Sequence, residues 1–150
     1  MDTPMKTYHH TQRGTFILVA MSVTAVAMLL GGLAMRPLLF GIPILALCAW
    51  LFHSLTIEIS EGELRWRFEP GWIHKRVSLA EITSARIVRT NVLEGWGIHL
   101  SRFGWLYNVS GFNAVSITLK NGKRFCLGTD EPSVLMAKLN EHLEAIGPQA

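Results

Sequence analysis

Histidine is the residue type in this sequence that could most readily do chemistry, as a metal ligand or as a general acid or base. The six histidines are scattered, and none has a Cys, Asp or Glu partner at the spacing of a metal motif; they are His9, His10, His53, His74, His99 and His142. The adjacent pair His9-His10 lies in a polar N-terminal stretch, which favours solvated side chains. The sequence therefore predicts no metal centre.

Motifs for nucleotide binding or nucleophilic catalysis do not occur either. Gly95-x-Gly97 lacks a third glycine because Leu100 stands at that position, and there is no P-loop or G-x-S-x-G pattern. Cys48 falls in an apolar run and Cys126 in an expected buried strand, so each is expected to act as a small apolar residue and not to form a disulfide. We therefore expect no enzyme activity and no cofactor.

Four basic residues on neighbouring expected strands suggest a different chemistry, the binding of an anionic lipid headgroup. They are Arg65, Arg67, Lys75 and Arg76, and three glutamates are interleaved with them, Glu58, Glu63 and Glu69. Anionic-lipid sites usually gather about 4–8 basic residues without such acids, so a solvated strand face is the competing interpretation. Residues 56–150 carry eleven Lys/Arg and ten Asp/Glu, a balance that argues against nucleic acid as a partner.

The segment from Glu94 to Asn113 could instead contact a protein partner. It combines several glycines, which permit unusual backbone shapes, with five aromatic residues, Trp96, Phe103, Trp105, Tyr107 and Phe112. Aromatic side chains dominate binding energy where they are exposed at interfaces, but they also fill cores. We expect this segment to be the main partner-contacting surface, with a core role as the alternative.

Two apolar runs precede these candidate residues. No charged residue occurs from Thr15 to Met35 or from Pro37 to Ile57. A membrane-spanning helix needs about 20 mostly apolar residues, so the sequence predicts a transmembrane hairpin over 16–55, with helices at 16–35 and 38–55. A cleaved signal peptide is the competing interpretation of the first run, but that run is too long and its only A-x-A pattern is central.

Basic residues near the ends of the two runs predict their orientation. The outer flanks carry four of them, Lys6, Arg13, Arg65 and Arg67. The connecting turn carries only Arg36. Because Lys and Arg favour the cytoplasmic side, we expect a two-pass protein of the inner membrane. Both termini would be cytoplasmic, and residues 1–15 would form an N-terminal tail.

Small residues line one face of the first predicted helix and would let another helix approach closely in lipid. They are Ala20, Thr24, Ala27 and Gly31. A corresponding face of the second helix holds Ile42, Ala46, Ala49 and His53. We expect the two faces to pack on each other within the hairpin. The alternative is an interface with an oligomer or another partner.

Residues 56–150 show the alternation of apolar and polar side chains that is typical of β-strands. Leu64, Trp66 and Phe68 should be buried while Arg65 and Arg67 are exposed. The dipeptide Asn121-Gly122 predicts a tight hairpin, because both central residues of a type I′ turn need positive φ. Residues 131–146 predict an amphipathic helix. The expected domain is thus α+β and mainly β, with six or seven strands followed by one helix.

Several short motifs resemble those of bacterial pleckstrin-homology-like membrane proteins. They are Gly95-Trp96-Gly97-Ile98, Tyr107-Asn108-Val109-Ser110-Gly111, Ala114-Val115 and Gly128-Thr129-Asp130-Glu131-Pro132. The two apolar runs fit the same group, so the resemblance covers nearly the whole chain after its first residues. It implies a barrel of about seven antiparallel strands capped by a C-terminal helix. It implies no established activity.

Two functional classes follow from these observations. The first is a membrane-anchored interaction module that binds protein partners or self-associates, in addition to its contact with the lipid bilayer. The alternative is a module that senses lipid headgroups at the inner membrane surface. Attraction of lipids through Lys and Arg falls with ionic strength, whereas an aromatic protein interface should not.

Overall fold

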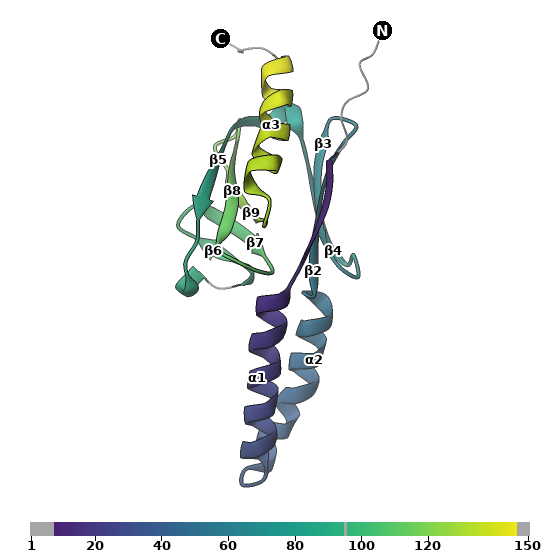
Figure 1. Ribbon diagram of the computed structural model, residues 1–150, viewed down its shortest axis with the longest axis vertical. Helices are drawn as coiled ribbons and strands as arrows, with labels where there is room; N and C mark the ends of the chain where they lie inside the picture. Colours follow the sequence, from purple (N-terminus) through teal and green to yellow (C-terminus); the bar gives the residue numbers. More distant parts are fainter. Residues whose placement is uncertain (1–7, 95, 147–150) are drawn as a thin grey trace.

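The computed structural model describes residues 8–94 and 96–146, which form a mixed α+β fold (Figure 1). Two β-sheets and a C-terminal helix make up one end of the molecule. A pair of N-terminal helices protrudes from the other end. The candidate residues all lie in the β-rich part, and its attachment to the helices decides how they are presented.

The first sheet is antiparallel and follows the order β1-β2-β3-β4. Its strands are β1 (Tyr8–Arg13), β2 (Ser54–Ser60), β3 (Glu63–Phe68) and β4 (Ile73–Ser78). The predicted alternation in β3 is confirmed: its three apolar side chains are buried, while Arg65 is half-buried and Arg67 is exposed. The ring of Trp66 stacks on Phe125 of the second sheet, with ring centroids 4.8 Å apart, and so joins the two sheets.

Strand β1 corrects the expectation that residues 1–15 form a tail. It pairs with β2 over its whole length, from Tyr8 opposite Ile59 to Arg13 opposite Ser54. Tyr8 and Gln12 are buried. The segment contains only one large apolar residue, so its alternation was too weak to reveal a strand. It forms because the outer edge of β2 needs partners for its backbone N–H and C=O groups. Residues 1–7 lie outside the described residues.

The second sheet is mixed and follows the order β5-β8-β9-β7-β6. Its strands are β5 (Ile82–Arg89), β6 (Gly97–Ser101), β7 (Gly104–Asn108), β8 (Asn113–Leu119) and β9 (Arg124–Gly128). β7 and β9 run parallel, and the other neighbours are antiparallel. The nine strands of the described residues thus differ from the expected set of about seven antiparallel strands. The chain leaves a gap between β7 and β8, and β9 returns into it.

The hydrophobic core lies between the two sheets, and helix α3 (Pro132–Ile146) packs against β5 and β8. Leu135 and Leu139 of α3 are fully buried, which confirms the predicted C-terminal amphipathic helix. The Asn121-Gly122 hairpin between β8 and β9 is also confirmed. Its turn differs from the predicted type, because only Gly122 has positive φ, while the Asn121 side chain accepts a hydrogen bond from the backbone N–H of Lys123.

The N-terminal helices are α1 (Thr15–Gly32), a 3₁₀ helix η1 (Arg36–Phe40) and α2 (Gly41–Leu51). Among the described helices only α1 is long and apolar enough to span a membrane, so the prediction of one continuous spanning helix at 38–55 is wrong. Pro43 has no N–H to bond the Leu39 carbonyl, and the chain before Gly41 winds as a 3₁₀ helix. After Leu51 the chain soon enters β2.

The predicted small-residue face does not form the seam between these helices. Ala20, Thr24 and Ala27 are exposed. The half-buried residues of α1 instead include Leu18, Met21, Ala25 and Met28. Those of α2 include Leu45 and Cys48 together with Ile42 and Ala49, two residues of the predicted face. Of the small face, Gly31 alone approaches the second limb, where an added Cβ would lie 3.0 Å from Leu38.

Candidate functional site

The four basic residues predicted from the sequence lie together along one groove beside β4. Arg65, Arg67, Lys75 and Arg76 line this groove of about 600 Å³ with His74, Thr56, Glu58, Trp66 and Gly71. The strand register explains the grouping, because Arg65 lies opposite Arg76 and Arg67 lies opposite His74. The structure therefore brings all four predicted headgroup contacts to one place.

Carboxylates neutralise most of this basic groove. Arg65 Nε donates a hydrogen bond to Glu63 Oε2 at 2.8 Å, and this bond raises the pKa of Arg65 above its usual value. Arg67 Nε lies 3.3 Å from Glu69 Oε1, and Arg76 Nη1 lies 4.0 Å from Glu63 Oε1. Within the described residues, Lys75 is the one cation of the four without an ion pair. An anion entering the groove would have to compete with these glutamates.

The five aromatic residues of the 94–113 segment separate into four environments. Tyr107 is buried and packs edge-on against Trp66, so it belongs to the core and cannot contact a partner. Trp96 and Phe112 contact Phe16 in the first turn of α1, with ring centroids 5.7 and 6.3 Å apart. These two aromatics join the β-domain to the helix pair.

Phe103 and Trp105 occupy the remaining two environments of the segment. The guanidinium of Arg102 lies 4.8 Å from the centroid of the Phe103 ring, so this half-buried ring is covered by a cation. Trp105 is 52% exposed and lies opposite Leu100 of β6, which is 71% exposed. Leu100 and Trp105 therefore form an apolar pair on the surface.

Strand β6 places Leu100 of this apolar pair at an unprotected sheet edge. It is the last strand of its sheet, and its sequence, GIHLS, contains no Lys, Arg, Asp or Glu. β4, one of the two edges of the other sheet, carries Lys75 and Arg76, and charges of this kind discourage strand addition. β5 is covered by α3. Of these three edges, β6 is the one best suited to receive another strand.

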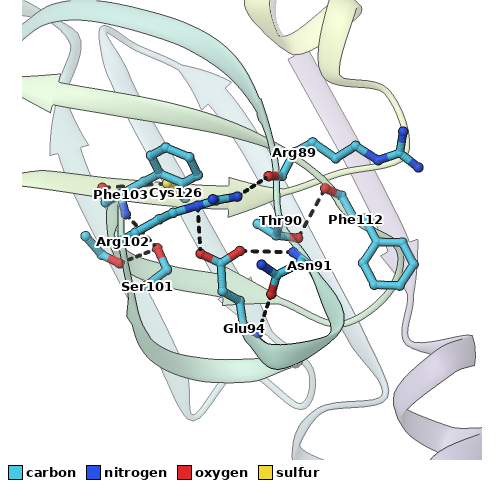
Figure 2. Close-up of polar contacts among 10 residues, drawn as sticks. Arg89, Thr90, Asn91, Glu94, Ser101, Arg102, Phe103, Phe112 and Cys126 are labelled. Carbon is cyan, nitrogen blue, oxygen red and sulfur yellow. Dashed lines mark hydrogen bonds and ion pairs between the residues drawn. The ribbon is translucent and has the colours of Figure 1, made fainter.

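A polar network that the sequence analysis missed shapes the loop between β5 and β6. The backbone N–H of Asn91 donates to Glu94 Oε2, and the backbone N–H of Glu94 donates to Asn91 Oδ1, each at 3.0 Å (Figure 2). This reciprocal cap encloses the 3₁₀ helix η3 (Val92–Glu94). The Glu94 side chain is only 11% exposed and lies 3.3 Å from Arg102 Nε. An N-x-x-E pattern was the available sequence signal.

Three further hydrogen bonds anchor this loop to the sheet. Arg102 Nη2 donates to the carbonyl of Arg89 at 3.3 Å (Figure 2). Thr90 donates to the carbonyl of Phe112 through its backbone N–H at 2.7 Å and its hydroxyl at 3.1 Å. The β5 end of the loop is thus anchored to the sheet, although the loop lies outside the core.

The surroundings of two titratable side chains near this loop, Cys126 and His99, favour packing over nucleophilic chemistry. Burial raises the pKa of the Cys126 thiol, which contacts the Phe103 carbonyl at 3.8 Å. A nucleophilic cysteine needs a lowered pKa. Burial also lowers the pKa of His99, and its Nε2 has no hydrogen-bond partner among the described residues.

Histidines at the domain surface hold elements together. His10 Nε2 lies 2.6 Å from Asp130 Oδ1, and its Nδ1 lies 3.3 Å from Glu131 Oε2, so β1 is tied to the start of α3. His53 and His74 each bond a backbone carbonyl three residues earlier. Across residues 8–94 and 96–146, no group of three or more His, Cys, Asp or Glu side chains is placed to hold a metal ion.

A comparison with models of known protein families finds no match to this chain, and a comparison with curated proteins finds none either.

Proposed function

We propose that this chain is a membrane-anchored interaction module, in which a hairpin of α1, η1 and α2 lies in the bilayer and the β-domain binds a protein partner. One observation carries the membrane part: the hairpin presents its apolar side chains outward without cover. Only 11% of the residues of α1 are buried. The large exposed residues include Val23, Leu30, Leu33, Phe40 and Ile44. A large exposed apolar surface indicates contact with a membrane or a partner.

The pairing of β1 with β2 requires the hairpin to return to its starting side. Arg13, just before α1, lies opposite Ser54, just after α2. If α1 crosses the membrane, the second limb must cross back. From rises of about 1.5 Å per α-helical and 2.0 Å per 3₁₀ residue, α1 and the combined η1–α2 limb are each about 27 Å long. That is close to the roughly 30 Å of a bilayer core.

The position of β1 also disfavours cleavage of α1 as a signal peptide. Removal of α1 would take β1 with it and expose the edge of β2. It would also remove the bond from Gln12 Nε2 to the Ser110 carbonyl at 3.0 Å. The basic flanks Lys6 and Arg13 support the orientation in which both termini and the β-domain are cytoplasmic, at an inner membrane.

We further propose that the β-domain is pleckstrin-homology-like. Two facing sheets with a C-terminal helix packed against one of them support this assignment. The parallel contact between β7 and β9 departs from the all-antiparallel barrel that the resemblance implies. The proposal therefore rests on the two-layer arrangement and on the motifs, not on strand order.

The partner is a protein segment that adds as a strand to β6. The free backbone groups of an edge strand supply hydrogen bonds, and exposed side chains beside it supply specificity. Here Leu100 and Trp105 would provide the apolar contact. A second copy of the chain could use the same edge, which is the self-associating form of the same function.

Crosslinking in native membranes tests this binding site. A photo-crosslinking amino acid at Leu100 is expected to capture a protein, whereas the same group at Asn121, exposed in the β8–β9 turn, should not. Trp105→Ala should reduce the captured product while leaving the melting temperature nearly unchanged, because half of the Trp105 surface is already in solvent. A product of twice 16.8 kDa would identify a second copy. Equal products from both positions, or none from Leu100, would contradict the proposal.

Sensing of anionic lipid headgroups is the second candidate function, and the convergence of the four basic residues favours it. Lys75, which lacks an ion pair within the described residues, would make the first contact. In discs of mixed lipids, the chain should then retain phosphatidylglycerol more than Lys75→Gln does, and high salt should abolish the difference. Equal retention by both proteins would remove this candidate.

A further inference from the structure

The helix η3 exposes two apolar side chains that contribute nothing to the core. Leu93 is 96% exposed and Val92 is 67% exposed. A flexible loop could expose such residues without consequence. These two, however, lie between Asn91 and Glu94, whose reciprocal hydrogen bonds fix the turn (Figure 2). The nearly buried Glu94 carboxylate and its ion pair with Arg102 reinforce it.

The hydrogen bonds around η3 place it at the end of the β-domain that meets α1. Thr90, just before η3, bonds the Phe112 carbonyl, and Trp96, just after it, donates from Nε1 to the Gly111 carbonyl at 3.2 Å. Phe112 and Trp96 both contact Phe16 in the first turn of α1. In Figure 1, η3 (teal) lies level with the start of α1 along the long axis of the molecule.

An exposed aromatic side chain also lies at the same end of the domain, beside α2. Trp72, in the β3–β4 turn, is 71% exposed. Its ring meets Trp50 of α2 edge-on, with centroids 5.2 Å apart. Tryptophan is enriched where a membrane meets water, because its ring is apolar and its N–H is polar. Trp72, in a turn of the first sheet, and η3, between two strands of the second, thus lie at the same level along the long axis of the molecule.

We propose that η3 is a second membrane contact, in which Val92 and Leu93 enter the interface of the bilayer that holds the hairpin. This inference rests on the proposed membrane anchor. The lipid surface is the fitting occupant because η3 exposes these side chains level with the start of α1, where the uncovered apolar surface of the hairpin begins. Arg13 and Arg89, exposed at the same rim, suit the headgroup layer. The contact would prevent the β-domain from tilting on its two short connections to the hairpin.

Fluorescence quenching by lipids tests the contact in the full chain. Leu93→Cys is labelled with an environment-sensitive dye, and the protein is reconstituted into phosphatidylcholine–phosphatidylglycerol vesicles that carry a quencher near the headgroup or near the chain ends. The dye at position 93 is expected to be quenched more strongly by the shallow lipid, since interfacial groups lie about 5–10 Å deep. Val23→Cys in the middle of α1 should show the opposite preference, and Asn121→Cys, far from the hairpin, should show no quenching.

The control positions separate failure of this inference from failure of the anchor. If position 23 is quenched and position 93 is not, η3 does not touch lipid and the inference is overturned, while the membrane anchor stands. If neither is quenched, the anchor itself is wrong. The unsubstituted chain, labelled in parallel, measures the background from Cys48 and Cys126. All three substituted residues are exposed, so the fold should tolerate the changes.

Discussion

His99 shows how the buried environment of a single side chain couples stability to pH. Burial lowers its pKa, and the nearby Glu94 only partly opposes this effect. In the unfolded chain the pKa returns to about 6.5. Between these two values the unfolded chain binds a proton that the folded chain does not, so the stability present above about pH 6.5 is lost as the pH falls.

Between pH 7.5 and pH 5, we expect the melting temperature of His99→Gln to fall less than that of the parent protein. The reason is that the glutamine side chain cannot take up that proton. Circular dichroism of the detergent-solubilised full chain measures the difference. Titrations of the carboxylates are common to both proteins and cancel in the comparison. An identical pH dependence for parent and variant would show that His99 is not the group responsible.

Substitutions at Gly104 and Gly97 distinguish the cost of backbone strain from the cost of a steric clash. Both have nearly the same positive φ, +107° and +105°. A Cβ on Gly104 would collide with the Arg124 carbonyl, whereas a Cβ on Gly97 meets nothing within 4 Å. Gly97→Ala should cost about 1–2 kcal/mol of unfolding free energy from conformation alone. Gly104→Ala should cost clearly more, and equal costs in thermal unfolding would contradict the reported contact.

For single residues, the alternation of apolar and polar side chains predicted burial well in strands with an uninterrupted pattern and poorly elsewhere. It correctly assigned the buried face of β3, because apolar and charged residues alternate there without interruption. It could not divide the aromatics of the 94–113 segment among core, helix junction and surface. That division depends on which strand lies beside β7 and where α1 starts, and both are tertiary facts.

At the scale of elements, the cap of η3 should control local rather than global stability. Asn91→Ala removes the acceptor for the Glu94 backbone N–H and should cost the turn about 1 kcal/mol. Because η3 lies outside the core, the melting temperature should barely move. Hydrogen exchange at the Glu94 amide should accelerate, while exchange in β8 should not. Unchanged exchange at Glu94 would mean that the turn does not depend on the cap.

The elements themselves were largely predictable, but their pairing was not. Patterns indicated α1, α3, strand β3 and the β8–β9 hairpin. Strand β1 was missed because it is polar and becomes a strand only by pairing with β2. The insertion of β9 beside β7 has no local signal either. It brings Gly128 so close to the Asn108 side chain that no Cβ would fit, which is a consequence of the fold rather than a sign of it.

For the whole molecule, the central relation is between the β1–β2 pair and the apolar hairpin that it closes. The sequence located the hairpin but overestimated its second helix, because residues 54 and 55 already belong to β2. Of the small-residue face expected to join the two limbs, only Gly31 approaches the second limb, and the other three residues are exposed. The helices therefore protrude together from one end of the β-domain, with most of their surface uncovered.

Labelling of single cysteines with a membrane-impermeant maleimide in intact cells tests this account most directly. Ala34→Cys lies at the tip of the hairpin and Asn121→Cys in the β8–β9 turn, and both positions are exposed. The unsubstituted chain gives the background from its two native cysteines. We predict that position 34 is labelled in intact cells and that position 121 is labelled only after the membrane is permeabilised. Labelling of both positions only after permeabilisation, or of position 121 in intact cells, would contradict a hairpin that crosses the membrane with its β-domain in the cytoplasm.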